Sequence, residues 1–462
     1  MAVYSAFYGI GIKEGKMKQR LSWTNRILVG FTLFSMFFGA GNLIFPPFLG
    51  YLAGSNLWPA AAGFILSAVC LPVLGVAAVA LAGGLDKLAG RVHPGFSVFF
   101  TVLIYLAIGP CVAIPRTAGT AYEMAVLPFL GELAGKETQL IFSVLFFCVA
   151  VFFAMRPDKL TDRLGKVTGP SLMILIALLL AGCIFWPVGQ SGPAAGGYAE
   201  NPVSQGFVAG YQTMDAMAAL NFGIVIALNI RTRGIKSDGA LVRETIYSGL
   251  IAGGVLALVY CSLAYMGNMG GLELTGAENG VRVLTWVADS LYGRTGMILL
   301  AGIFFIACLN VCIGLLSCCS EYFAGFLPGI SSRGWTVIFA VISLFISNAG
   351  LTGVLKISGP VIEAIYPVSI VLILLAFLNR RLEHFSLAYP CCVGFTAAAS
   401  ICLTLASYWE GAPAFIKTAA LLPGAAAGLG WILPAALGCG AGCLCSGLRN
   451  RADIGSRRRG EE

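Results

Sequence analysis

Long apolar runs follow one another along nearly the whole chain, and short polar segments separate them. Each run has roughly 17 residues or more, enough for an α-helix to cross a hydrocarbon core of about 30 Å. The pattern predicts about 12 transmembrane helices, at 27–52, 58–83, 96–124, 138–155, 166–188, 205–230, 240–266, 297–325, 335–351, 354–378, 386–408 and 423–447. We therefore predict an all-α polytopic membrane protein.

Composition and charge placement give this prediction an orientation. The chain is 58% hydrophobic and 11% charged, whereas soluble domains carry roughly 25% charged residues. Most of the 29 Lys and Arg fall in segments on one side of the predicted membrane, and the other side carries only Lys136, Arg282, Arg294 and Lys417. Because Lys and Arg accumulate in cytoplasmic loops, both termini are predicted to be cytoplasmic. The net charge of +8 reflects this bias, so we predict no nucleic-acid binding.

The predicted organisation is a single membrane domain with short ends. Residues 1–26 form a cytoplasmic segment, 27–447 the transmembrane domain and 448–462 a basic cytoplasmic tail. The first span is too long for a cleavable signal peptide, and the natural start is either Met1 or Met17. The 15 Cys lie mostly within apolar spans without His or acidic partners, so we predict that they pack there. No cofactor is expected.

The first span contains a stretch that cannot form a regular helix, "MFFGAGNLIFPPFLG" at 36–50. Gly39, Ala40 and Gly41 permit unwinding, and Pro46 and Pro47 are expected to keep the helix from resuming at once. Unwound backbone inside a membrane is tolerated only where it faces protein, water or a ligand. Amides at the start of the second half-helix then suit an anion, and carbonyls at the end of the first suit a cation.

A second interruption is predicted five spans later, in "GYQTMDAMAALNFGIVIAL" at 210–228. This span contains Gln212, Thr213 and Asp215, and then Asn221 and Gly223. An Asp at mid-membrane depth is rare and is functional by default, although pairing for packing alone is the alternative. Interruptions at matching places in two halves are the pattern of transporters built from inverted repeats.

Five motifs in order along the chain resemble the bacterial branched-chain amino acid:cation symporters. They are "FFGAGNLIFPP", "YLAIGPCVAIPRTA", "GYQTMDAMAALNFGIVI", "ACLNVCIGLLSCCSEYF" and "ISGPVIEAIYP". The resemblance implies a multi-pass protein of the bacterial inner membrane that takes up Leu, Ile and Val with a monovalent cation, Na⁺. It also implies a leucine-transporter-like 5+5 inverted repeat, with spans 1–5 and 6–10 as the repeats, spans 1 and 6 broken, and spans 11 and 12 peripheral.

The same resemblance implies roles for individual residues. The amides of Ala40, Gly41 and Asn42 would hold the substrate carboxylate, and the Asn42 side chain would help to bind a cation. Carbonyls near Thr213 and Met214, with the Asp215 carboxylate, would receive the ammonium or a cation. The candidates for an apolar pocket around the substrate side chain are Tyr105, Ile114, Met217 and Leu220.

A second cation site is implied between spans 1 and 8. The carbonyls of Ser35 and Phe38 would contribute from span 1. In span 8 the sequence departs from the resemblance, because Asn310 and Val311 stand where a hydroxyl residue is expected. Asn310 offers an amide oxygen and Ser317 lies two turns further on, and hard cations accept either kind of oxygen.

Several polar residues leave alternatives open. Three of them would broaden the choice of substrate, admit proton coupling, or pair within the bundle. They are Gln212, Asn221 and Glu363, and the proton coupling would act through Glu363. Arg116 and Glu123 are seven apart and share a helix face, which fits a structural ion network or an outer gate. A proton-coupled or differently specific small amino acid transporter is thus the alternative function. An enzyme would need a cluster of catalytic groups at one membrane face, which the sequence lacks, so we predict that the protein is not an enzyme.

Overall fold

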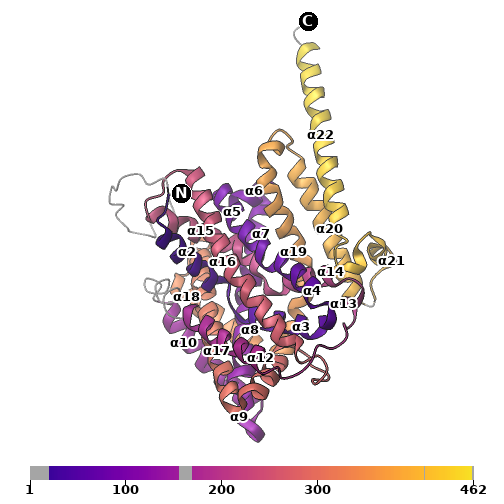
Figure 1. Cartoon of the computed structure of the whole chain (residues 1–462). Helices are drawn as coiled ribbons and strands as arrows, with labels where there is room; N and C mark the ends of the chain where they lie inside the picture. The colour runs from indigo at the N-terminus through magenta and orange to yellow at the C-terminus, as the bar shows by residue number, and fades with distance from the viewer. Residues whose placement is uncertain (1–19, 156–168, 410, 460–462) are drawn as a thin grey trace.

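The computed structural model describes residues 20–155, 169–409 and 411–459, and within these ranges the chain forms helices and connecting turns, without strands (Figure 1). The predictions for residues 1–19, including the start at Met17, and for the beginning of the fifth span lie outside the described residues. The all-helical membrane architecture predicted from the apolar runs is confirmed.

The first half of the bundle contains the helices up to residue 185. They are α2 (Trp23–Phe37), α3 (Ala40–Ala53), α4 (Leu57–Ile65), α5 (Leu71–Ala82), α6 (Leu85–Gly90), α7 (Pro94–Leu106), α8 (Ala113–Ala125), α9 (Leu127–Leu130), α10 (Lys136–Ala154) and α12 (Gly169–Phe185). Two π-helical turns join α4 to α5 and α7 to α8, at Leu66–Cys70 and Ala107–Cys111.

The second half begins after a loop. Its helices are α13 (Gly197–Glu200), α14 (Pro202–Ala209), α15 (Asp215–Thr232), α16 (Asp238–Asn268), α17 (Gly280–Phe326), α18 (Ser332–Ser347), α19 (Gly350–Leu382), α20 (Ala388–Tyr408), α21 (Ala414–Lys417) and α22 (Ile432–Arg459). By length and apolar composition, eight helical stretches of the described chain can cross a membrane. One of them, Ala40–Ala82, passes through parts of two predicted spans, so the number of twelve crossings stays a prediction.

One predicted helix start agrees with the structure and one is wrong. Helix α17 is interrupted at Gly293, which has φ 55°, so its second part begins close to the predicted 297, after a first part that begins at Gly280. The last helix begins at Ile432 and not at 423, because Gly424 and Gly428 take left-handed conformations that end regular helix there. It also continues to Arg459, through residues predicted to be a tail.

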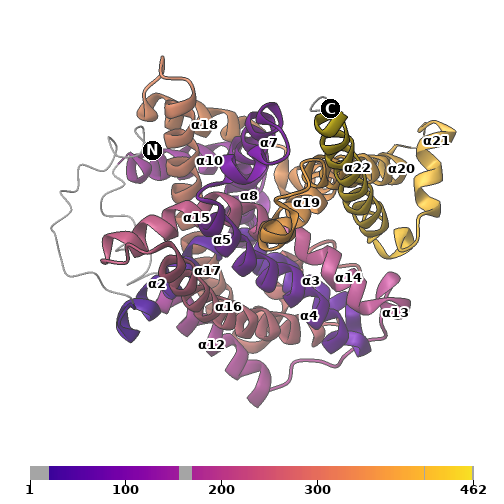
Figure 2. The same ribbon diagram turned by 90° about the horizontal axis from the view of Figure 1, so that it is seen from above.

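Close helix packing and one buried ion pair stabilise the bundle. A methyl group at Gly50 of α3 would lie 1.9 Å from the Ala264 carbonyl oxygen of α16, so only glycine lets these two helices approach so closely. Helix α2 is joined to α16 near the start of α16, where Arg26 Nε donates to Glu244 Oε2 at 2.6 Å and Nη2 to Oε1 at 2.9 Å. Helices α20 and α22 lie at one edge, beside α19 (Figure 2).

Candidate functional site

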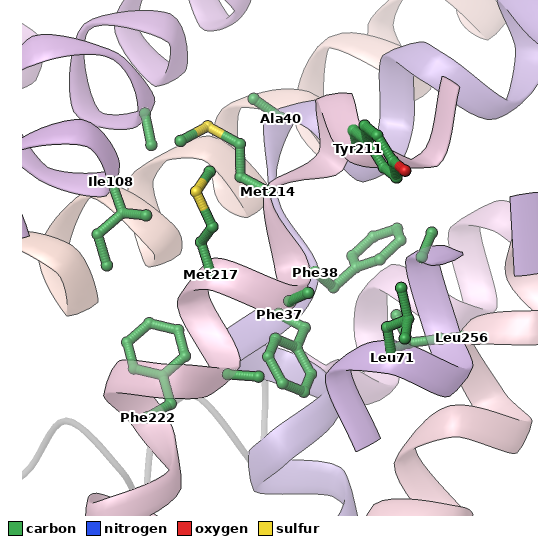
Figure 3. Close-up of a cluster of buried hydrophobic side chains, with 14 of the residues drawn as sticks. Phe37, Phe38, Ala40, Leu71, Ile108, Tyr211, Met214, Met217, Phe222 and Leu256 are labelled. Atoms are coloured by element: carbon green, nitrogen blue, oxygen red, sulfur yellow. The ribbon is translucent and has the colours of Figure 1, made fainter. Parts of the chain in front are cut away.

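Both predicted interruptions are present, and they lie against each other at the centre of the bundle. Between α2 and α3, Phe38 and Gly39 are extended, with φ −73° and −135°. Between α14 and α15 the chain makes a 3₁₀ turn at Gly210–Thr213 and then passes through Met214, at φ 65°. Figure 3 shows the two unwound segments together, with the Met214 side chain extending toward the helix that carries Ile108.

The first interruption is shorter than predicted. Gly39 N–H donates to Asn42 Oδ1 at 3.0 Å, so the Asn42 side chain caps a helix that begins at Ala40. Pro46 and Pro47 therefore do not delay the helix but lie within it, where they remove the N–H groups that would bind the Asn42 and Leu43 carbonyls. A side chain at Gly39 is excluded, since its Cβ would lie 2.7 Å from Val311 Cγ2.

The second interruption stores backbone strain. Among the described residues, Met214 is the one non-glycine with a positive φ, a conformation that costs about 1–3 kcal/mol and recurs at functional sites. Two backbone hydrogen bonds hold it: Met214 N–H donates to the Tyr211 carbonyl at 2.9 Å, and Ala218 N–H donates to the Met214 carbonyl at 2.9 Å. The strained residue directly precedes Asp215 and places this carboxylate at the start of α15.

A buried hydrogen-bond network ties the two interruptions together. Asn42 Nδ2 donates to Asp215 Oδ2 at 2.6 Å, and the Tyr260 hydroxyl of α16 donates to the same oxygen at 2.9 Å. Asn42 Nδ2 also donates to the Tyr260 hydroxyl oxygen. Thr213 Oγ1 accepts from Asp215 N–H at 3.4 Å. Tyr260 was not predicted, because one of three tyrosines in α16 carries no distinguishing pattern in the sequence.

Arg116 of α8 enters the same region. Its side chain is buried, its Nη1 donates to the Gln212 carbonyl at 2.7 Å, and its Cζ lies 5.5 Å from the centre of the Phe45 ring. No salt bridge to Glu123 or to any other described carboxylate is present. Of the two predictions for this pair, the ion network of Arg116 with Glu123 is therefore wrong, since the arginine turns toward the interruptions, and the outer gate stays a prediction.

A small pocket, with a cavity volume of about 30 Å³, lies where these groups meet. One part of its lining is polar and comes from the interruptions and Arg116, and the rest is largely apolar. The polar part includes Gly39, Ala40, Gly41, Asn42, Arg116, Thr117, Thr213 and Asp215, and the apolar part includes Met36, Phe37, Ile108, Ala113, Met214, Ala218, Phe222, Val311 and Leu315. The pocket thus offers one positive and one negative side chain beside an apolar wall.

Six of the predicted substrate residues line this pocket and four do not. Those that do are Ala40, Gly41, Asn42, Thr213, Met214 and Asp215. Ile114 is buried outside the lining, and Tyr105 stacks on Tyr322 of α17 with ring centres 4.0 Å apart. The π-helical turn at Ala107–Cys111, with non-helical dihedrals at Gly109, changes which side chains of this span face the pocket, so Ile108 and Ala113 line it instead. Met217 and Leu220 are buried behind the lining.

The residues predicted for the second cation site lie at the end of α2 and on α17. Ser35 and Phe38 are buried there, and neither lines the pocket. On α17 it is Val311, and not Asn310, that lines the pocket. The Ser317 hydroxyl donates to the Ala154 carbonyl of α10 at 3.3 Å and so points to another helix.

The other polar residues have separate surroundings. Gln212 contributes its backbone carbonyl to Arg116. Asn221 is buried, and within the described part of the chain its amide group has no hydrogen-bond partner. Glu363 Oε1 accepts from the Tyr408 hydroxyl of α20 at 3.0 Å, and the residue does not line the pocket.

Apolar membrane helices that surround two interrupted helices, with a pocket at the interruptions, form the architecture of secondary transporters. This architecture is that of a transport protein. A family model described as "Branched-chain amino acid transport protein" matches residues 22–449, and the chain belongs to this family. The protein is therefore a transport protein and not an enzyme.

Curated relatives agree over nearly their whole length. The chain is 38% identical to the branched-chain amino acid permease BraB of Bacillus subtilis over 426 residues, which cover 91% of this chain and 95% of the relative. It is 35% identical to the branched-chain amino acid permease BrnQ of Escherichia coli K12, covering 90% and 94%. It is 41% identical to the branched-chain amino acid transport system 2 carrier protein of Pseudomonas aeruginosa, covering 77% and 80%.

Solved structures show the fold at much lower identity. The nucleobase-cation-symport-1 family transporter Mhp1 matches with a TM-score of 0.57 at 14% identity, covering 93% of this chain and 94% of that one. MhsT in complex with L-phenylalanine matches with a TM-score of 0.56 at 17% identity, covering 90% and 99%. The predicted leucine-transporter-like fold, with helices 1 and 6 broken, is confirmed.

Proposed function

We propose that this protein is a secondary active symporter that imports leucine, isoleucine and valine together with Na⁺. The observation that carries the proposal is the pocket between the two interruptions, where Arg116 and Asp215 supply opposite charges beside an apolar wall. An α-amino acid is a zwitterion, so such a pocket matches both of its charged groups. The apolar wall suits an aliphatic side chain, because each buried CH₂ group contributes about 0.8 kcal/mol.

For the cation we propose oxygen ligands at the end of α2. The Ser35 and Phe38 carbonyls lie there, Asn42 lies in the first turn of α3, and Asn310 directly precedes Val311, which lines the pocket. Asn42 Oδ1 accepts one hydrogen bond from Gly39 N–H, and an amide oxygen has a second lone pair for a cation. Coupling arises if the cation and the amino acid both bind better to one conformation of the transporter, since only differential affinity shifts a conformational equilibrium.

A proton-coupled transporter is the second candidate. It is favoured by Asp215, a carboxylate that is buried at the pocket and therefore a group through which proton binding would change the charge of the site. The same pocket would prefer another small amino acid if its apolar wall fits that side chain better than it fits leucine, isoleucine or valine.

We also propose that the protein lies in the bacterial inner membrane with both termini in the cytoplasm. The distribution of Lys and Arg along the sequence supports this orientation. The start of α2 and the end of α22 lie toward the same end of the bundle, and α9 lies at the opposite end (Figure 1).

The test is uptake of labelled leucine into proteoliposomes that contain the purified protein. One set has an inward Na⁺ gradient, a second a matched K⁺ gradient and a third an inward proton gradient without Na⁺. Accumulation with Na⁺ alone is expected. Accumulation with protons alone would replace the proposal by its proton-coupled form, and no accumulation under any gradient, from folded protein, would refute the assigned substrate. The Asp215→Ala variant is expected to insert but not to transport.

A further inference from the structure

Arg116 is a buried cation that the architecture alone does not explain. Its exposed fraction is 3%, and within the described residues its Nε has no hydrogen-bond partner and no carboxylate lies within salt-bridge distance of its guanidinium. Arginine is almost never fully buried unless it is paired, because removal of its charge from water is costly. An arginine in this state at the wall of a pocket indicates that its partner is a ligand.

One terminal nitrogen of this guanidinium lies beside the start of α3. Nη1 is held by the Gln212 carbonyl, and Nη2 lies 2.7 Å from the point where a Cβ on Gly41 would stand. The Nε and Nη2 edge is therefore the one that remains for a bidentate contact, the geometry in which arginine binds a carboxylate.

The start of α3 makes an anion at this place favourable. The N–H groups of Ala40, Gly41 and Asn42 form the first turn of a 14-residue helix and have no carbonyl one turn earlier to accept them. A helix N-terminus carries roughly half a positive charge, so a guanidinium beside it is repelled unless an anion lies between them. Arg116 and the start of α3 therefore form one anion site from two independent parts of the chain.

We infer that Arg116, together with the amides at the start of α3, binds the carboxylate of the transported amino acid. This inference rests on the proposed function. Asp215, at the other interruption in the same pocket, accepts the substrate ammonium, and its Oδ2 is already positioned by Asn42 and Tyr260. Arg116 thus acts as a fixed counter-ion, so that the carboxylate needs no bound cation for charge balance. A substrate without a carboxylate would leave Arg116 unpaired and would therefore bind weakly.

The test compares leucine with leucinamide, which has the same side chain and ammonium but no carboxylate. Dissociation constants are measured by calorimetry on the purified, detergent-solubilised protein. For the wild type we expect leucine to bind at least about 100-fold more tightly, since a site built for a polar group strongly rejects an analogue that lacks it. In Arg116→Gln the leucine affinity should fall while the leucinamide affinity stays close to its wild-type value, so that their ratio falls at least tenfold.

A matched control and a second variant separate binding from structure. Arg91→Gln makes the same change at an arginine that bonds the Tyr389 hydroxyl at 3.2 Å and does not line the pocket, and it should leave the ratio unchanged. Arg116→Lys keeps the charge but loses the two parallel N–H donors of the guanidinium, so it should lower the ratio of the two affinities by a smaller factor. If Arg116→Gln does not fold, Arg116→Lys is the variant that tests the inference. An unchanged ratio in the folded Arg116 variants, with both affinities lowered equally or not at all, would overturn the inference. A wild type that binds no leucine would instead overturn the proposed function.

Discussion

A single methyl group at Gly41 is expected to disable the anion side of the pocket. In Gly41→Ala the new Cβ would stand 2.7 Å from Arg116 Nη2 and 3.3 Å from Thr213 Cα, whereas Cβ atoms in proteins essentially never approach a non-bonded atom within 3.0 Å. The Thr213 contact is to backbone, so the arginine must move. Because Arg116 is buried and held by the Gln212 carbonyl, this movement withdraws the guanidinium from the position described above.

The size of the effect follows from the contact that is lost. A hydrogen bond to a charged group contributes about 1.5–3 kcal/mol, and each 1.4 kcal/mol is tenfold in affinity, so the Kd for leucine should rise about 10- to 150-fold. Stability should change little, because alanine favours helix over glycine by about 0.5–1 kcal/mol and offsets part of the steric cost. The variant should therefore be folded but weak in binding.

The assay is calorimetric titration with leucine, together with a thermal unfolding curve for each protein. The matched control is Gly302→Ala in α17, where nothing lies within 4 Å of the added methyl group, and its Kd should equal that of the wild type. A Gly41→Ala protein that binds leucine within twofold of the wild-type Kd would refute the placement of the carboxylate at the start of α3.

Three further substitutions test the framework around the pocket through thermal unfolding of the purified protein. Tyr260→Phe removes a buried hydrogen bond to Asp215 and should lower the free energy of unfolding by about 1–3 kcal/mol. Arg26→Gln removes two charge-assisted hydrogen bonds from the Glu244 carboxylate, which is 0% exposed and keeps Arg243 Nη2 at 3.5 Å, and should cost about 1.5–3 kcal/mol, part of which the double variant with Glu244→Gln should recover. Gly50→Ala would place a methyl group 1.9 Å from a carbonyl oxygen of α16 and should cost about 1–3 kcal/mol or more by overpacking.

Each of these predictions has a control of the same chemical kind. Tyr265→Phe changes a half-buried tyrosine on the same helix as Tyr260 and should be near neutral. If Tyr260→Phe is equally neutral, the network at Asp215 contributes no stability. A double variant at Arg26 and Glu244 no more stable than Arg26→Gln would contradict the buried-charge explanation. Gly302→Ala serves as the control for Gly50→Ala, and equal melting temperatures for the two would contradict the close packing of α3 on α16.

The sequence alone determined the class of the protein and the places where its helices break. Twenty-residue apolar runs separated by charged loops have no stable arrangement other than membrane-crossing helices, so the all-helical architecture follows from composition and period. Gly39 and Gly41 in one span, and Asp215 in another, likewise marked both interruptions, because glycine and buried charge are costly in a regular membrane helix. These are local properties of the chain.

Tertiary structure alone decided which side chains meet at the interruptions. Tyr260 has no distinguishing pattern in the sequence, and Arg116 stands out there only for its spacing from Glu123; packing alone brings Tyr260 to Asp215 and Arg116 to Gly41. The π-helical turn at Ala107–Cys111 shifts the pocket-facing residues away from Tyr105, a change that a regular helical period does not foresee. Contacts between residues that are far apart in the sequence depend on how the helices pack, and no local pattern of residues specifies them.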